Sequence, residues 1–388
     1  MSRSPTVQPL VTGLLAALVG FGSSFAVIIQ GLRTVGATPA EAASGLMALS
    51  IAMGLAGIFL ALRYRMPISV AWSTPGAALL ATTGAVEGGF PAAVGAFIVA
   101  GAALTLAGFW KPLARGVGAI PPALANAMLA GVLLGLCLAP VRAVAASPVP
   151  ALAIIVTWAV VARFRRLYAV PAAVLVTIVL VATTTSLDGV TADLLWPHPV
   201  AVMPVFNVTA LVGIALPLFI VTVASQNIPG MAVLNANGYY PPAGPLFATT
   251  GLAGLLAAPF GSHAVNLAAI TAAICAGPDA HPDPAQRYKA AVTAGIVYVL
   301  FGLLAGAAMV LLTAAPPVLI EAVAGLALLG AFGASLVNAL SVERDRVAAV
   351  ITFLVAASSL SFLGIGGAFW GLVAGGAVLT LTRWRRAA

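Results

Sequence analysis

Long apolar runs, separated by short polar or charged segments, fill almost the whole chain. A helix that crosses a membrane needs about 20 apolar residues. The pattern predicts fourteen such spans, seven in each half of the chain. In the first half they lie at about 10–31, 40–62, 67–84, 90–109, 120–139, 149–163 and 168–185. In the second half they lie at about 206–230, 242–259, 260–276, 288–312, 317–338, 346–362 and 366–383.

Two of these runs, 67–84 and 260–276, are short for plain helices, and residues that favour helix starts interrupt both. In the first, Thr74 is a good N-cap and Pro75 suits the first helical position, while the residues before them have an extended pattern. In the second, a helix is expected to start at or near Asn266, another good N-cap. We therefore predict that spans 3 and 10 are each a short strand followed by a half-helix that begins inside the membrane.

The composition agrees with this picture. Hydrophobic residues make up 62% of the chain and charged residues 7%, and the mean hydropathy is +1.13, whereas soluble domains are about 25% charged. These values exclude an ordinary soluble globule and a disordered chain, and the spans leave no room for a soluble domain. The net charge of +8 does not indicate nucleic-acid binding, because the basic residues lie in short loops between spans.

The basic residues alternate from loop to loop, which indicates the topology. With the N-terminus in the cytoplasm, only Arg33 and Arg142 lie on the outer side. We therefore expect an even number of spans, both termini in the cytoplasm, and a location in the cell inner membrane. The other basic residues, all on the cytoplasmic side, are Arg3, Arg63, Arg65, Lys111, Arg115, Arg163, Arg165, Arg166, Arg287, Lys289, Arg344, Arg346, Arg383, Arg385 and Arg386.

The two halves of the chain resemble each other. Residues 121–135 match 316–330 at seven of fifteen positions, an offset of 195, and both segments open on Pro-Pro. Residues 67–74 can be laid on 259–266 at an offset of 192. Because seven spans is an odd number, the second copy must run through the membrane inverted, and inverted repeats with broken helices near the midplane are typical of secondary transporters. The two repeats would be residues 1–195 and 196–388.

The two helix starts at Thr74 and Asn266 would point free N–H groups and positive dipole ends at one central place, which suits an anion. The alternative is a pair of proline kinks that merely bend helices. His263, beside Ser262, is an ionisable residue at membrane depth, and histidine titrates near neutral pH. We interpret it as functional, the alternative being a neutral histidine that serves packing.

Glu321 is the one acidic residue placed well inside a predicted span, and Asn126 has the matching place in the first repeat. A buried carboxyl group can change its protonation state with its surroundings, so Glu321 is a candidate for a coupled proton. Its closeness to Pro317 allows the alternative of an acid at a helix start. Gln226 and Asn227 precede Pro-Gly and predict a polar, distorted end of the eighth span, or else a loop at the membrane interface.

Small polar residues between aromatic residues mark the first span, at Phe21, Ser24 and Phe25. Together with Trp72 and Ser73 they suit an aromatic substrate, although such residues also favour close helix packing. The sequence holds no HExxH, P-loop, GxGxxG or zinc-ligand motif. We therefore expect no enzyme and no cofactor, and an ion gradient as the source of energy.

Three segments, Gly20–Phe25, Ala71–Gly76 and Pro259–Thr271, resemble the benzoate:proton symporter (BenE) family, and the similarity runs over nearly the whole chain. That family is related to nucleobase transporters with seven-plus-seven inverted repeats. The resemblance implies a core domain of spans 1–4 and 8–11 and a gate domain of spans 5–7 and 12–14. In the nucleobase relatives, acidic residues in the eighth and tenth spans hold the base. Those places fall here on Gln226 and His263, which fits a carboxylate better than a nucleobase.

The sequence thus predicts an all-α polytopic membrane protein that takes up benzoate or a similar aromatic acid with H⁺ by alternating access. The carboxylate would lie between the Thr74 and Asn266 helix starts, with His263 as ligand and proton carrier and Glu321 as second candidate for the proton. The alternatives are a nucleobase or other organic or inorganic anion carrier, and a membrane receptor or scaffold that does not move its ligand. The expected partners are the substrate, H⁺, the lipid bilayer and, because dimers are common among relatives of this fold, a second copy of the chain, with no nucleic acid. Further substrate contacts are expected from Phe21, Ser24, Phe25, Trp72, Ser73, Gln226, Asn227 and Ser262.

Overall fold

The computed structural model describes residues 7–110, 121–184, 196–358, 360–363 and 365–387. The charged loop residues Lys111 and Arg115, and the expected end of the first repeat at residue 195, lie outside the described residues. The helices of the first half are α1 (Gln8–Gly22), α2 (Phe25–Thr34), α3 (Pro39–Tyr64), α4 (Thr74–Thr83), α5 (Gly89–Phe109), α7 (Pro122–Cys137), α8 (Ala139–Ala146), α9 (Pro148–Arg165) and α10 (Ala169–Thr184).

The second half begins with one interrupted helix, which includes the π-helical turns η3 and η4. Its parts are α11 (Val208–Ala210), η3 (Leu211–Ala215), α12 (Leu216–Thr222), η4 (Val223–Asn227) and α13 (Ile228–Ala236). The later helices are α14 (Ala243–Ala257), α15 (Ile270–Ala276), α16 (Tyr288–Leu303), α17 (Ala305–Ala314), α18 (Pro317–Leu340), α19 (Arg346–Ala357) and α20 (Gly367–Ala387). The strands are β1 (Val70–Trp72), β2 (Val265–Leu267), β3 (Ser361–Phe362) and β4 (Ile365–Gly366).

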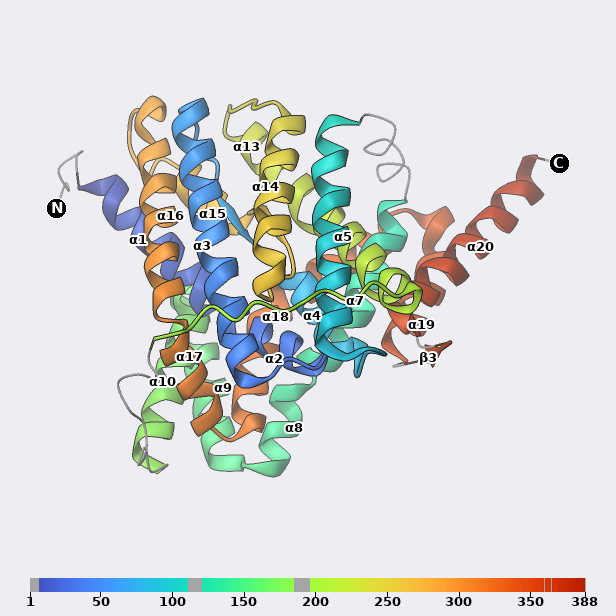
Figure 1. Cartoon of the computed structure of the whole chain (residues 1–388), viewed down its shortest axis with the longest axis horizontal. Coiled ribbons are helices and arrows are strands. Elements are labelled where there is room, and N and C mark those ends of the chain that lie inside the picture. The colour runs from blue at the N-terminus through green and yellow to red at the C-terminus, as the bar shows by residue number, and fades with distance from the viewer. Residues whose placement is uncertain (1–6, 111–120, 185–195, 359, 364, 388) are drawn as a thin grey trace.

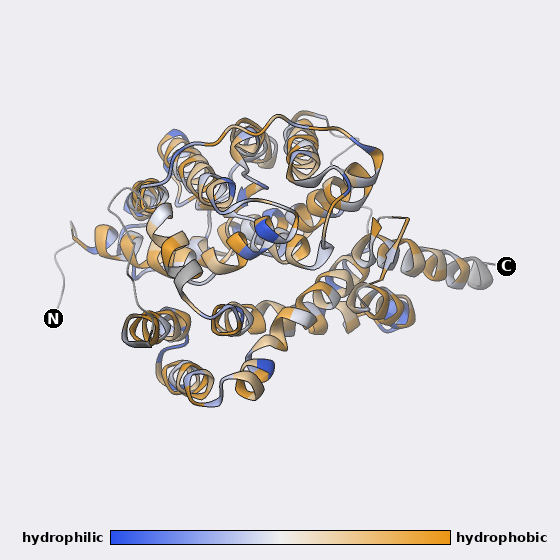
Figure 2. Ribbon diagram, turned by 60° about the horizontal axis from the view of Figure 1, so that its bottom comes forward, coloured by the Kyte–Doolittle hydropathy of each residue, from blue (hydrophilic) through white to orange (hydrophobic). Residues whose placement is uncertain are grey.

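The outer surface of the helices is apolar, as a lipid environment requires. Eight helical segments of the described chain are long and apolar enough to cross a membrane. Large side chains such as Leu55, Phe59 and Leu106 are exposed, and hydrophobic residues dominate the helices throughout the view of Figure 2. The other predicted spans are shorter or interrupted, so the count of fourteen crossings stays a prediction.

Two predicted spans contain interruptions that the apolar pattern does not reveal. The first span breaks at Ser23 and Ser24, between α1 and α2. The eighth continues to Ala236 as α13, so the expectation that Gln226 and Asn227 form a helix end is wrong. They lie inside the span, in the π-helical turn η4, because the proline two residues further on has no N–H to donate and a widened turn accommodates this loss.

The short strands of spans 3 and 10 pair with each other, as an antiparallel ladder of three residue pairs: Val70 with Leu267, Ala71 with Asn266, and Trp72 with Val265. The predicted combination of strand and half-helix is therefore present in both spans. The two strands begin 195 residues apart, which is the offset of the Pro-Pro segments. The offset of 192 for these spans is wrong.

The starts of the two half-helices differ from the prediction. Helix α4 is capped by Ser73, whose Oγ accepts a hydrogen bond from the Gly76 N–H at 3.1 Å, so Thr74 is the first helical residue and not the cap. Helix α15 begins only at Ile270. The prediction of Asn266 as its N-cap is wrong, because Asn266 is engaged in the ladder opposite Ala71.

Close helix packing surrounds the ladder. Helix α3 lies along α16, α5 along α14, and α7 along α18 and α19, whereas α20 projects from one end of the molecule (Figure 1). The backbones of α3 and α16 meet at Gly54 and Gly295, where a Cβ on either residue would come within 2.6–2.7 Å of the carbonyl oxygen of the other. Only glycine at both positions allows this approach. The glycine pair therefore fixes the position of α3 and α16 on one side of the ladder.

Candidate functional site

Most of the predicted site residues gather around the ladder of β1 and β2, and a polar cluster lies at each of its two ends. The end at Trp72 and Val265 leads into α4 and back to α14. The end at Val70 and Leu267 leads back to α3 and on into α15. We call the first cluster the histidine end, formed by Ser73, Thr222, Ser262 and His263. We call the second the tyrosine end, formed by Ser69, Thr271, Cys275 and Tyr298.

His263 is the central side chain of the histidine end and is 1% exposed. Its Nε2 lies 2.9 Å from the carbonyl oxygen of Ser73. Because a carbonyl oxygen can only accept, Nε2 must carry a proton, and the neutral ring then has no proton on Nδ1. This Nδ1 atom is buried without a hydrogen-bond partner. The ring also lies edge-on to Phe97, at 6.4 Å between centroids. His263 therefore presents one unpaired acceptor at membrane depth.

Ser73 connects three elements at this end. Its Oγ accepts hydrogen bonds from the Gly76 N–H and, at 3.0 Å, from the Thr222 hydroxyl of α12, while its carbonyl oxygen binds His263. The neighbouring Ser262 hydroxyl is buried and has no partner. Thr222 was not among the predicted site residues, because a lone threonine in an apolar run carries no signal of its own.

A small cavity of about 10 Å³ lies against β2 on this side, lined in part by Thr222, Thr250, Ala264 and Val265. That volume holds about one water molecule. This cavity is too small for an aromatic acid.

Two amide side chains bond to backbone groups along the ladder. Asn227 Oδ1 accepts the Leu267 N–H at 2.8 Å, and its Nδ2 is buried without a partner. Asn266, with its amide turned so that nitrogen faces β1, donates to the carbonyl oxygens of Ala71 at 3.1 Å and Trp72 at 3.2 Å. Asn227 thus holds the ladder to the eighth span and keeps a free donor.

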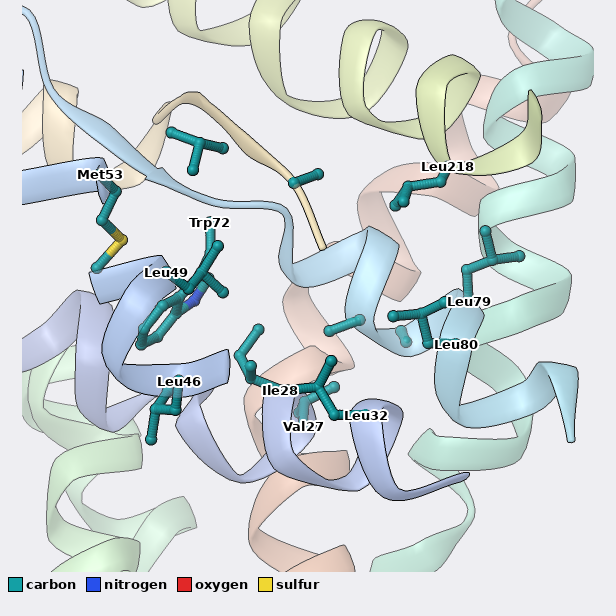
Figure 3. Packing of buried hydrophobic residues seen from close by; sticks show 14 of the residues in the cluster. Val27, Ile28, Leu32, Leu46, Leu49, Met53, Trp72, Leu79, Leu80 and Leu218 are labelled. Carbon is teal, nitrogen blue, oxygen red and sulfur yellow. The ribbon is translucent and has the colours of Figure 1, made fainter. Parts of the chain in front are cut away.

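Trp72 joins the third span to the break in the first. Its indole Nε1–H donates to the Ser24 hydroxyl at 2.8 Å, and that hydroxyl donates to the Gly20 carbonyl oxygen at 3.2 Å. Trp72 is 2% exposed and belongs, with Leu49 and Met53, to the main cluster of buried hydrophobic residues (Figure 3). The break between α1 and α2 therefore supplies the one polar partner that a buried indole requires.

An aromatic cluster adjoins Trp72. Phe21 stacks on Phe25 at 5.5 Å, and lies 5.3 Å from Trp72 and 4.8 Å from Phe301 of α16, measured between ring centroids. Phe21 and Phe301 are only partly buried. A Cβ added at Gly22 would meet nothing within 4 Å, so open space borders this cluster. Phe301 was missed in the sequence analysis because it lies within an apolar run.

The remaining predicted residues differ in their placement. Thr74, at the start of α4, and Gln226, in η4, are both partly exposed. The turn η4 contacts both β2 and α7. Glu321, by contrast, lies in α18, which packs against α7 and α8, and it is partly exposed. The structure therefore gathers the predicted substrate residues around the ladder and places Glu321 on a separate element.

The tyrosine end was not predicted at all. Ser69, Thr271 and Tyr298 are 5%, 3% and 2% exposed, and Cys275 is fully buried. Thr271 faces the Tyr298 hydroxyl and Ser69 faces the Cys275 thiol, in contacts that do not reach the geometry of well-formed hydrogen bonds. All four residues are uncharged and isolated in apolar runs, so only the fold brings them together.

Comparisons with known proteins agree on one family. The family profile described as benzoate membrane transport protein (BenE) matches residues 4–381. Inner membrane protein YdcO of Escherichia coli K12 is 45% identical over 369 residues, which cover 95% of this chain and 94% of that protein. The benzoate membrane transport protein of Acinetobacter baylyi is 32% identical over 375 residues, with the same coverage.

Solved structures show the same fold at low sequence identity. SLC26A9 superposes with a TM-score of 0.65 at 13% identity, over 97% of this chain and 65% of that chain. The transmembrane domain of the cyanobacterial bicarbonate transporter BicA superposes with a TM-score of 0.57 at 16% identity, over 98% and 96%. This likeness confirms the predicted class of a polytopic helical membrane protein with inverted repeats.

Proposed function

Since the chain belongs to the family of benzoate membrane transport proteins, we propose that it takes up benzoate or a similar aromatic carboxylate together with a proton. The observation that carries the proposal is the aromatic cluster of Phe21, Phe25, Trp72 and Phe301 beside the polar ladder. A substrate with an aromatic ring and a carboxylate requires these two surfaces next to each other.

The ring would lie against Phe21 and Phe301, the partly exposed members of the cluster. Aromatic pairs in offset or tilted arrangements contribute about 0.5–1.5 kcal/mol beyond the area they bury. Open space borders Gly22, the residue that follows Phe21 in the chain. Entry of the ring there leaves the Trp72–Ser24 hydrogen bond intact.

The carboxylate would lie at the start of α4, where Thr74 is partly exposed and the helix dipole favours an anion. Asn227 Nδ2 is an unpaired donor on a side chain that is bonded to β2 through its oxygen. The amide of Gln226 is beside it in the widened turn η4. Neutral amides bind a carboxylate without adding a fixed charge, so the anion can leave again.

His263 would carry the proton on Nδ1, the unpaired acceptor of its ring. Moving one elementary charge across 100 mV costs about 2.3 kcal/mol, so uptake of the anion alone opposes a negative-inside potential. One proton per carboxylate cancels this cost. Glu321 is the second candidate for the coupled proton.

The transport cycle would move a gate domain of spans 5–7 and 12–14 against a core domain of spans 1–4 and 8–11. The ladder, the aromatic cluster and His263 all belong to the proposed core. We place the protein in the inner membrane, because the Escherichia coli relative is named an inner membrane protein, with both termini in the cytoplasm.

A second candidate is another organic or inorganic anion, favoured by the fold it shares with a bicarbonate transporter. The neutral amides at the ladder would bind such an anion equally well. The aromatic cluster would then have no role in binding, which makes the two candidates separable by competition between benzoate, bicarbonate, sulfate and uracil.

The test is uptake of radiolabelled benzoate into proteoliposomes, with and without an inward proton gradient. We expect the gradient to stimulate uptake by the wild type and this stimulation to be lost in His263→Ala. His281→Ala is the matched control, because His281 lies in the loop after α15. Stimulation retained in His263→Ala would move the coupling elsewhere, with Glu321→Gln next.

A different result of the same assays would refute the substrate assignment. Folded wild-type protein that shows no benzoate uptake and no counterflow, but accumulates another anion, would refute the aromatic substrate. A ligand that binds without any counterflow would indicate a receptor.

A further inference from the structure

An extended segment between the two halves of the chain lies across three helices of the proposed core domain. Residues 200–207 have no regular secondary structure, and their trace crosses α3, α14 and α5 (Figure 1). We call this segment the strap. Its Val202 N–H donates to the carbonyl oxygen of Pro259, just after α14, at 2.8 Å, and its Val205 N–H donates to the carbonyl oxygen of Pro91 in α5 at 3.0 Å. These bonds fix the path of the strap over the helices.

Ser44 of α3 joins the strap to the turn η5 (Ala258–Phe260), which follows α14. Its side chain is fully buried. The Oγ accepts the Val200 N–H at 2.9 Å and donates to the Phe260 carbonyl oxygen at 3.1 Å. The Val200 carbonyl oxygen, at 3.3 Å, is the more distant acceptor for the single hydroxyl proton. One hydroxyl thus satisfies a backbone group of the strap and another of the turn, so it holds both against α3.

The turn η5 leads directly to His263. Between them lie Gly261, whose φ of +91° favours glycine, and Ser262. The backbone of α3 lies against this turn, because a Cβ added at Gly45 would come within 2.7 Å of the Gly261 carbonyl oxygen. The residues that precede His263 are therefore held from two sides, by α3 and by the strap.

The orientation of the His263 ring depends on this backbone. Within the described part of the chain, the ring makes one hydrogen bond, from Nε2 to the Ser73 carbonyl oxygen, and Nδ1 makes none. A neutral imidazole can carry its proton on either nitrogen, and its hydrogen bonds decide which one. A shift of the His263 backbone that lengthens the bond to Ser73 would therefore remove the preference for a proton on Nε2.

We propose that Ser44 and the strap are positioning elements for His263. They hold the turn η5 so that Nε2 stays bonded to Ser73 and Nδ1 stays free to accept a proton. The inference deepens the proposed function and rests on it where transport is concerned, because His263 is the proton carrier there. Ser44 acts through the Phe260 carbonyl group, and the strap acts through that of Pro259.

The experiment reads the His263 ring directly, by NMR of the full-length protein with ¹⁵N-labelled histidine. The chain has three histidines, and the signal of His263 is the one that is absent from His263→Ala. We expect the wild type to show one tautomer, with the proton on Nε2. Ser44→Ala leaves the Val200 N–H and the Phe260 carbonyl oxygen without the Ser44 hydroxyl. The loss of a partner disfavours the native geometry by a factor of about 5 to 150, so a second tautomer should appear in Ser44→Ala.

Ser50→Ala is the matched control. Ser50 is also fully buried in α3, but its hydroxyl donates to the Leu46 carbonyl oxygen of the same helix. We expect this variant to keep the wild-type signal of His263. Benzoate uptake driven by a proton gradient, measured in the same variants, should fall in Ser44→Ala and stay at the wild-type rate in Ser50→Ala.

Two proline variants of the strap keep the test decisive if Ser44→Ala does not fold. Val202→Pro removes the N–H that binds Pro259, whereas Val205→Pro removes the N–H that binds Pro91 and leaves the bonds to the turn in place. We expect the His263 signal to change in Val202→Pro and to match the wild type in Val205→Pro.

Two results would overturn the positioning role. One is a wild-type His263 signal in folded Ser44→Ala and Val202→Pro. The other is an equal change in Ser50→Ala or Val205→Pro, because a general loosening of the packing would then be the cause. A changed signal with unchanged gradient-driven uptake would instead support the positioning role and defeat the proton-carrier role of His263 in the proposed function.

Discussion

The hydrogen bond from Trp72 to Ser24 provides a quantitative test of the site. It is the polar link between the break in the first span and the strand of the third, at 2.8 Å and in a buried setting. Ser24→Ala removes the acceptor and leaves the indole N–H without its partner. Trp72→Phe removes the donor, while the Ser24 hydroxyl keeps its bond to the Gly20 carbonyl oxygen.

The expected magnitude follows from the burial. A buried donor that loses its partner costs about 1–3 kcal/mol, which is a factor of about 5 to 150 in the folded-to-unfolded ratio. In the double variant both partners are gone, and replacing both by apolar groups is close to neutral for the hydrogen bond itself. The double variant should therefore be more stable than the sum of the two single effects predicts, by about 1 kcal/mol or more.

The assay is a double-mutant cycle on unfolding in detergent, with benzoate affinity measured alongside. Single effects that add to within about 0.5 kcal/mol would show that the two groups are not coupled, and would refute the reasoning. Phe25→Leu is a useful companion, because it changes the neighbouring aromatic packing and leaves the hydrogen bond in place.

Two further predictions concern packing and pH. Gly295→Ala should destabilise the protein by about 1–3 kcal/mol through overpacking against Gly54. Gly135→Ala, where an added Cβ meets nothing within 4 Å, should raise stability by up to about 1 kcal/mol, because alanine favours the helix more than glycine. A loss of stability of equal size in both variants would contradict the close approach of α3 and α16. Burial raises the pKa of Tyr239, in the loop after α13, above its ordinary value of 10. Because the folded state then holds its proton more tightly than the unfolded state, the contribution of this phenol to stability is complete below pH 10 and is lost as pH rises through the raised value. Melting curves from neutral pH upward should therefore fall less steeply above pH 10 for Tyr239→Phe than for the wild type, and parallel curves would refute this.

The sequence predicts the elements well where the chemistry is local. Thr74 and Pro75 mark the start of α4 to within one residue, because caps and first-turn prolines act on their own neighbours. The same reasoning fails at Asn266, since a good N-cap residue can equally satisfy a strand. Pairing with Ala71 decides the outcome, and that partner is far away in the chain.

The residues of the candidate site stand out in the sequence, but their contacts do not. His263, Trp72 and Ser24 stand out as polar or aromatic residues within apolar runs, but nothing in the sequence shows that Trp72 donates to Ser24 or that His263 binds the backbone of Ser73. The residues of the tyrosine end, by contrast, could not be singled out from the sequence. A single serine, threonine or tyrosine in an apolar run is common, and such residues become informative only when three elements bring them together.

The three-pair ladder also constrains how the protein is made. Val70 and Val265 are 195 residues apart, so the first strand leaves the ribosome long before its partner exists. In hydrocarbon each unpaired backbone group costs several kcal/mol, and the third span therefore cannot take its final depth while it is alone. Its backbone must stay hydrated or shielded by other protein until the second half arrives. The first half therefore reaches its final fold only after the second half has been made. A chain truncated before the second strand should be degraded by quality-control proteases.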